Sequence, residues 1–81
     1  MEEYESEEEA LTRASKLLGI ALEKIKLTEP KTILYEFPIN KVLRVYQVNE
    51  NLSLGIGFTR HHQGKNFYGL WLIEGEKIER I

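Results

Sequence analysis

The sequence predicts an α+β protein in which one N-terminal amphipathic helix packs on a mostly antiparallel meander of four or five strands. Three observations lead to this prediction: a marked helix start followed by an apolar stripe, a series of alternating runs separated by turn residues, and a globular composition. With 81 residues, 42% of them hydrophobic and 30% charged, the chain fits a single domain over residues 1–81.

The helix is predicted to begin at "SEEE" (residues 6–9), which has the spacing of a capping box. In that motif the Ser6 hydroxyl accepts from the Glu9 N–H, and Glu9 reaches back to the Ser6 N–H. Gly19 leaves the end of the helix undecided. Either the helix continues to about residue 26, or it stops at Gly19 and residues 24–28 form a strand. The apolar stripe at helical spacing consists of Ala10, Leu11, Ala14, Leu17, Leu18, Ala21, Leu22 and Ile25.

Four alternating runs and a short fifth follow, each bounded by Pro, Asn or Gly. They are "KTILYEF" (31–37), "VLRVYQV" (42–48), "LSLGIGFTR" (52–60), "NFYGLWLI" (66–73) and "KIERI" (77–81). The segment "HHQGK" (61–65) is predicted to be a turn, with Gly64 as the residue suited to a positive φ.

Both faces of the predicted sheet carry apolar side chains. In 52–58 the large apolar residues share one face, while Gly55 and Gly57 indicate a bulge, a bend or the close approach of another backbone. In 67–73 strict alternation places Phe67, Gly69, Trp71 and Ile73 on one face and Tyr68, Leu70 and Leu72 on the other. Since one helix cannot cover both faces, we expect an open apolar surface that binds a protein partner or a second copy, as a homodimer. The predicted interface residues are Gly55, Gly57, Phe58, Phe67, Tyr68 and Trp71.

Basic residues near the third and fourth runs are the candidates for nucleic-acid contact. They are Arg44, Arg60, His61, His62 and Lys65. Aromatic side chains between cations can stack bases and follow phosphates, so a single-stranded RNA partner is an alternative. A histidine base with Arg or Lys at the transition state would suit a small ribonuclease, and the element order resembles the RelE-type messenger-cleaving toxins. Those toxins are usually strongly basic, whereas this chain has a net charge of −2.

The composition argues against metals, cofactors and membranes. The chain has no cysteine, and its two adjacent histidines would point to opposite faces of a strand, so we expect no metal site and no cofactor. No apolar run is long enough to span a membrane, and the acidic N-terminus is unlike a signal peptide, which predicts a cytoplasmic protein. Six of the 13 acidic residues precede residue 10 while all 11 basic residues follow it, and every acid is Glu. This Glu/Lys/Ile-rich profile is typical of proteins from hot environments.

The stretch from residue 4 to residue 48 resembles the Jag N-terminal domain, which precedes KH-type RNA-binding segments. The residues that carry the resemblance are "SEEEALTRASKLLG" (6–19), "EKIKLTEPK" (23–31) and "VLRVYQV" (42–48). The family has a glycine-rich segment after the Pro-Lys turn, where this chain has "TILYEFPINK". The resemblance implies a leading strand within "EEYES", a helix that ends at Gly19, a strand at 24–28, and an adaptor role.

Taken together, the residues favour a small non-catalytic interaction module that binds a protein partner, or itself, through an apolar sheet face or an edge strand. A single-stranded RNA-binding domain is the second reading, and a RelE-like ribonuclease is the third.

Overall fold

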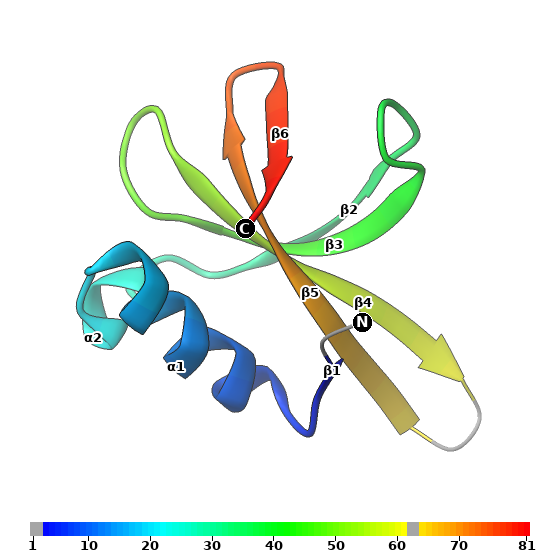
Figure 1. The fold of residues 1–81 in the computed structure, drawn as a ribbon, viewed down its shortest axis with the longest axis horizontal. Helices are drawn as coiled ribbons and strands as arrows, with labels where there is room; N and C mark the ends of the chain where they lie inside the picture. Colours follow the sequence, from blue (N-terminus) through cyan, green and yellow to red (C-terminus); the bar gives the residue numbers. More distant parts are fainter. Residues whose placement is uncertain (1–2, 62–63) are drawn as a thin grey trace.

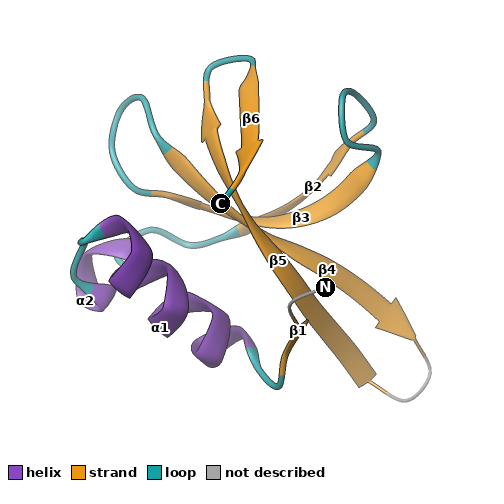
Figure 2. Ribbon diagram, viewed as in Figure 1, coloured by secondary structure: helices purple, strands orange, loops and turns teal. Residues whose placement is uncertain are grey.

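The computed structural model describes residues 3–61 and 64–81 and has the predicted α+β architecture (Figure 1). Helix α1 (Glu7–Leu18) and the short α2 (Leu22–Ile25) lie on one side of an antiparallel sheet, as the colours of Figure 2 show. The strands are β1 (Glu3–Tyr4), β2 (Lys31–Tyr35), β3 (Lys41–Gln47), β4 (Ser53–His61), β5 (Gly64–Glu74) and β6 (Lys77–Arg80).

Strands β2 to β6 form the predicted meander, in which each strand pairs with the next. The order across the sheet is β1-β5-β4-β3-β2, and β6 also pairs with β5. Because β4 occupies one edge of β5, β1 and β6 share the other edge, opposite 67–68 and 71–74 respectively. The sheet thus has one strand more than the alternating runs predicted. The additional strand, β1, lies in the stretch where the resemblance implied a leading strand.

The start of α1 is capped as predicted, with one change of partner. The Ser6 hydroxyl accepts from the Glu9 N–H at 3.1 Å. The Glu9 carboxylate accepts from the N–H of Glu5 at 2.8 Å, one residue before the predicted Ser6. Ser6 itself has extended backbone angles, as an N-cap residue should. The three glutamates of the first turn lie at the positive end of the helix dipole.

The helix ends at Gly19, which settles the ambiguity left by the sequence. Gly19 has φ +67° and its N–H donates to the Ser15 carbonyl at 2.9 Å, a left-handed cap that favours glycine. The predicted strand at 24–28 is wrong, because residues 22–25 form the single turn α2. The continuous stripe is also interrupted: Leu17 is 46% exposed, and Ile25 reaches the core only because the chain turns after Gly19.

Two hydrophobic clusters lie on the two faces of the sheet. The cluster on the helix side contains Ala10, Leu11 and Ala14 of α1 together with Leu54, Ile56, Phe67 and Leu70 of the sheet. The cluster on the face away from the helix contains Leu43, Val45, Trp71 and Ile73, with Ile33, Tyr35, Ile39, Tyr68 and Ile78 packed against it. We call these faces the helix face and the far face.

A bulge in β5 changes which side chains share a face. Ile56 pairs with Leu70 and the next residue, Gly57, pairs with Tyr68, so Gly69 is an extra residue in β5. Gly69 has φ +71°, which is typical of a bulge built on glycine. The strict alternation predicted for 67–73 is therefore wrong: Phe67 and Leu70 lie on the helix face, whereas Tyr68, Trp71 and Ile73 lie on the far face.

Candidate functional site

The aromatic residues predicted to form an interface are divided between the two faces. Phe58 and Phe67 stack on the helix face with ring centroids 5.5 Å apart. Tyr68 and Trp71 meet edge to face at 6.3 Å on the far face, and Trp71 is only 3% exposed. These four residues do not form one open patch. Phe67 and Trp71 belong to the core of the chain itself.

The two strand glycines mark close approaches within the same chain. A Cβ on Gly57 would lie 2.0 Å from the carbonyl oxygen of Tyr68, and one on Gly55 would lie 2.7 Å from Cδ1 of Leu43. Both neighbours belong to strands that pair with β4. The close backbone approach is thus made by β5 at Gly57, whereas at Gly55 the close neighbour is the Leu43 side chain of β3.

Cations cover the aromatic pair of the far face. The Arg80 guanidinium lies 5.2 Å from the centroid of the Trp71 ring, and the Lys41 ammonium lies 5.4 Å from that of Tyr68. Such contacts are favourable because the ring face is electron-rich. They close the middle of the far face, so the open parts of this face lie nearer to β2.

The residues predicted to contact nucleic acid do not form one group. Arg60 and Lys65 face one another across β4 and β5 and both are exposed. Arg44 is on β3, where its Nε donates to Glu7 at 3.0 Å and its Nη1 donates to Thr32 at 3.1 Å. His61 is the last residue of β4, in register with Gly64. His62 lies outside the described residues.

Glu7 connects α1 to β3 through a polar cluster. The carboxylate oxygen that accepts from Arg44 also accepts from the Tyr46 hydroxyl. Burial, together with the Glu7 carboxylate, raises the pKa of Tyr46 far above its usual range. Each of these polar groups has a partner, so the cluster is a structural link between helix and sheet.

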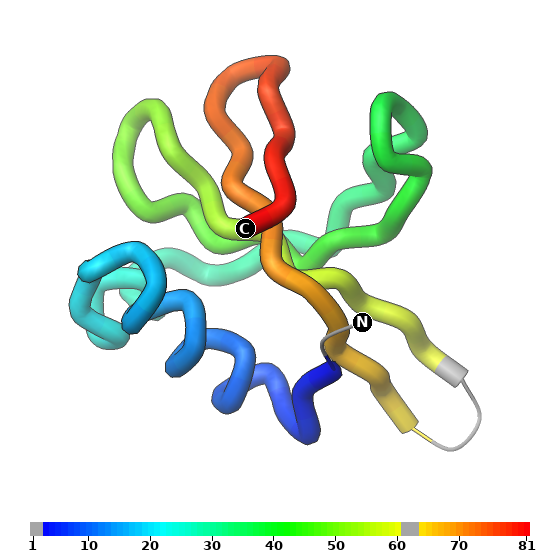
Figure 3. The backbone as a smooth tube through the Cα atoms, in the orientation of Figure 1, coloured from blue at the N-terminus to red at the C-terminus, as the bar shows by residue number. Residues whose placement is uncertain are grey.

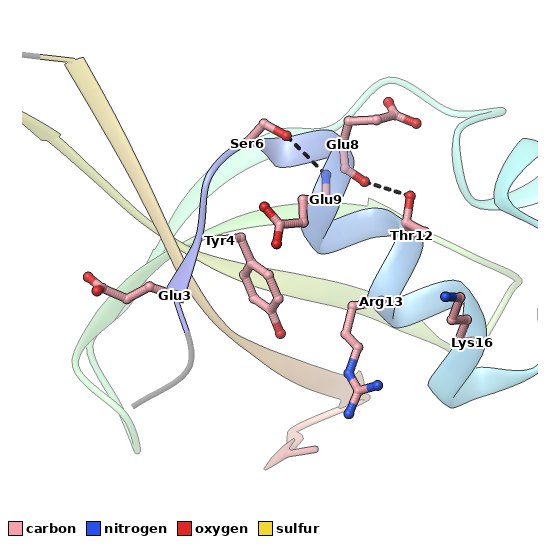
Figure 4. Close-up of a pocket in the computed structure, with 8 residues that line it drawn as sticks. All are labelled: Glu3, Tyr4, Ser6, Glu8, Glu9, Thr12, Arg13 and Lys16. Atoms are coloured by element: carbon pink, nitrogen blue, oxygen red, sulfur yellow. Dashed lines mark hydrogen bonds between the residues drawn. The ribbon is translucent and has the colours of Figure 1, made fainter.

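A groove on the outer side of α1 is one hollow lined by described residues. It has a volume of about 560 Å³ and lies between β1 and the first turns of α1 (Figure 4). Its lining mixes acidic residues with Arg13 and Lys16, and the Ser6 hydroxyl is engaged in the helix cap.

The strongest candidate is the free edge of β2 with the groove beside it. Among the described residues β2 is the last strand of the sheet order, so its outer edge carries unpaired backbone groups. Next to this edge Leu34 is 54% exposed and Phe37, in the turn that follows β2, is 88% exposed. Large apolar side chains that are exposed beside an open strand edge are typical of a binding surface.

The two turns that line the first part of the groove lie on the side of the molecule away from α1 (Figure 3). This part has a volume of about 450 Å³ and is lined by Tyr35, Phe37 and Pro38 from the β2–β3 connection and by Gly75, Glu76 and Ile78 from the β5–β6 hairpin. A second hollow of about 320 Å³ continues along β2 from Tyr35 past Ile33 and Lys31 to Thr28. The two hollows share Tyr35 and follow the length of β2 on the far face.

Leu34 and Phe37 were not among the predicted site residues. Ile33 and Tyr35 pack on the far face, so Leu34 points to the helix face, where α1 packs mainly against β4 and β5. The sequence contained one signal for Phe37, because the following Pro38 places it in a turn rather than in a strand. Which strand would be the free edge depends on pairing between distant segments, and no local pattern shows it.

Comparisons with protein families, curated proteins and solved structures find no match to this chain. In the described part of the chain, no cluster of three or more His, Cys, Asp or Glu side chains is placed to hold a metal ion. None of the described helices has the length and apolar character needed to cross a membrane.

Proposed function

We propose that this chain is a small non-catalytic interaction module that binds protein through the free edge of β2 and the groove beside it. The observation that carries the proposal is the exposure of Leu34 and Phe37 next to an unpaired strand edge. An extended segment added to such an edge gains backbone hydrogen bonds, and pockets for its alternate side chains give specificity. The adaptor role implied by the resemblance to the Jag N-terminal domain agrees with this proposal.

We prefer the β2 edge to the predicted aromatic interface because the apolar side chains beside the edge are exposed, whereas Phe67 and Trp71 are buried. Completely burying a side chain such as Leu or Phe contributes about 1.5–3 kcal/mol, but only if the side chain starts out exposed. Trp71 and Phe67 are already buried and have little left to contribute. Leu34, at 54% exposure, retains about half of its burial energy for a partner, and Phe37, at 88%, retains most of it.

The test has two parts, which are done on the same proteins. Light scattering from 10 μM to 1 mM measures self-association, and peptides selected from a random phage-displayed library are mapped by amide shifts. We expect at least one association, and we expect Leu34→Ser or Phe37→Ser to weaken it at least ten-fold. Leu17→Ser is the matched control, because Leu17 is also an exposed leucine but lies on α1.

Two outcomes would contradict the proposal. The first is a chain that stays monomeric at 1 mM and selects no peptide. The second is an association that Leu34→Ser and Phe37→Ser leave unchanged, or that shifts only residues of α1.

Binding of single-stranded RNA is the second candidate, and it rests on the exposed pair Arg60 and Lys65. Like charges directly across two strands repel each other, so a bound anion would relieve the repulsion. The basic site is limited to these two residues. Arg44 is paired with Glu7, and the Phe58 and Phe67 rings stack on the helix face. A titration with a short single-stranded RNA that shifts 59–66 in wild type but not in Arg60→Glu/Lys65→Glu would support it.

A further inference from the structure

We propose that the occupant of the β2 edge is a second copy of this chain, paired antiparallel through β2 about a two-fold axis at Ile33. The proposal rests on the proposed function, since it names the partner for the same edge. It follows from the symmetry of strand pairing, the exposed residues of β2 and the distribution of charge along the groove.

Symmetry limits how two β2 strands can pair. Two identical antiparallel neighbours in one sheet are related by an axis normal to the sheet, so paired residues must share a face and differ by an even number. For the five residues 31–35, complete overlap then has one solution: Ile33 pairs with Ile33 of the second copy, Thr32 with Leu34, and Lys31 with Tyr35. In this register every residue of β2 gains a neighbour.

The charges along the groove favour this antiparallel register. Lys31 lines one hollow together with Glu29, and Glu76 lines the other, while Tyr35 lies where the two hollows meet. Within one chain Lys31 and Tyr35 are roughly 13 Å apart along β2. Pairing places Lys31 of the second copy opposite Tyr35 and on the same face, where it reaches the groove wall that carries Glu76. The two-fold axis repeats this contact, so the dimer gains two attractions between opposite charges.

The apolar residues agree with the same arrangement. Leu34 lies opposite Thr32 of the second copy and one diagonal step from its Leu34, a distance at which long side chains meet. The half-buried Ile33 would be covered by its own symmetry mate. Ile33 and Leu34 of β2 are thus covered by the same residues of the second copy, as an isologous interface requires.

The cysteine-free chain allows a direct test of the register. Paired residues in an antiparallel sheet have Cα atoms about 4.5–5.5 Å apart, within the range of a disulfide. We expect Ile33→Cys to form a covalent dimer on mild oxidation. The matched control is Lys31→Cys, which should stay monomeric because the two positions 31 lie four residues apart along the pair.

A second pair of variants keeps the test valid if Ile33→Cys folds poorly. Thr32→Cys and Leu34→Cys are both at exposed positions, and an equimolar mixture should give the mixed dimer in excess over either self-linked dimer. Circular dichroism checks that each variant is folded before oxidation.

Charge reversal tests the contact between copies without cysteine. Lys31→Glu should raise the dimer Kd roughly ten-fold, since it replaces two attractions with two repulsions. Lys31→Glu/Glu76→Lys should restore the wild-type Kd. Because the two residues lie at opposite ends of the groove within one chain, a rescue of this kind is expected only across the dimer.

The outcomes separate this inference from the proposed function. A wild-type chain that is monomeric at 1 mM but binds peptides at β2 would overturn the dimer and leave the proposed function standing. Covalent dimers from Lys31→Cys, or a dimer that neither Ile33→Cys nor the 32/34 mixture captures, would overturn the register. A monomer that binds no peptide would overturn both.

Discussion

Replacing Gly57 with alanine should destabilise the chain severely, because β5 leaves no room for a Cβ at this position. The added atom would lie 2.0 Å from the Tyr68 carbonyl oxygen and 2.9 Å from two carbons of its ring. The ring can rotate away, but the carbonyl oxygen belongs to the backbone of β5. Gly57 and Tyr68 are paired residues, so the two strands must separate by about 1 Å or more at the bulge.

The cost can be estimated from two contributions. Overpacking that side chains can partly relieve costs about 1–3 kcal/mol. Separating the strands also weakens one or two backbone hydrogen bonds, each worth about 0.5–1.5 kcal/mol. The expected loss is therefore about 1.5–6 kcal/mol, compared with a total unfolding free energy of about 4–12 kcal/mol for a domain of this size.

Urea denaturation followed by tryptophan fluorescence is a suitable assay, because Trp71 is the only tryptophan and is buried. Gly75→Ala is the matched control: its Cβ meets open space, and only the positive φ opposes it, at about 1 kcal/mol. Gly55→Ala should lie between the two, since its nearest contact is the end of a leucine side chain. If Gly57→Ala and Gly75→Ala lose the same free energy, the close approach of β4 and β5 is not as described.

Three further predictions concern stability and are measured by the same urea assay. Ser6→Ala should cost about 1 kcal/mol by removing the helix cap, and Ser6→Asp should restore most of it; equal stability of all three would contradict the cap. Leu43→Ala should cost about 2–5 kcal/mol because Leu43 is completely buried on the far face, whereas Leu27→Ala, at an exposed leucine, should stay within about 0.5 kcal/mol. Because the pKa of Tyr46 is raised above its unfolded value near 10, the protonated hydroxyl contributes stability that is complete below pH 10 and is lost progressively as the pH rises from 10 toward the raised pKa. Wild type should thus lose more unfolding free energy between pH 9 and pH 11 than Tyr46→Phe, and parallel losses would argue against the burial of this hydroxyl.

Local signals in the sequence were sufficient to predict most elements of the fold. The Ser6 cap and Gly19 act on neighbouring backbone groups, so their effect is visible within a few residues. The strands could be predicted equally well, because Pro, Asn and Gly mark the turns between them. The strand predicted at 24–28 is wrong because α2 is a single turn of four residues (22–25), which is too short for its pattern to be distinguished from alternation.

The faces of β5 could not be predicted by alternation alone. One inserted residue at Gly69 reverses the face of every side chain on one side of it. A glycine inside a strand is a known sign of a bulge, and that sign was present at Gly69. Its effect on register, however, depends on how Gly57 of β4 fits against Tyr68.

The candidate site could be predicted only in part from the sequence. An open apolar surface and an edge strand were both expected, but the residues named for them are largely core. Leu34 and Phe37 become candidates only when β2 is known to be the outer strand and α1 is known to pack on β4 and β5. Both facts come from contacts between segments that are distant in the chain.

Strands β1 and β6 lie end to end along the same edge of β5. Ile81 donates its N–H to the Leu70 carbonyl at 2.9 Å, and Glu3 pairs with Tyr68 two residues away, so roughly 7 Å of edge separates β6 from β1. Both strands run antiparallel to β5, and the end of one therefore points to the start of the other. A short linker from residue 81 to residue 3 would join them into one continuous strand. A circular permutant opened in the turn at 49–51 should then keep every neighbour in the sheet, with the covalent break moved to the opposite side of β4.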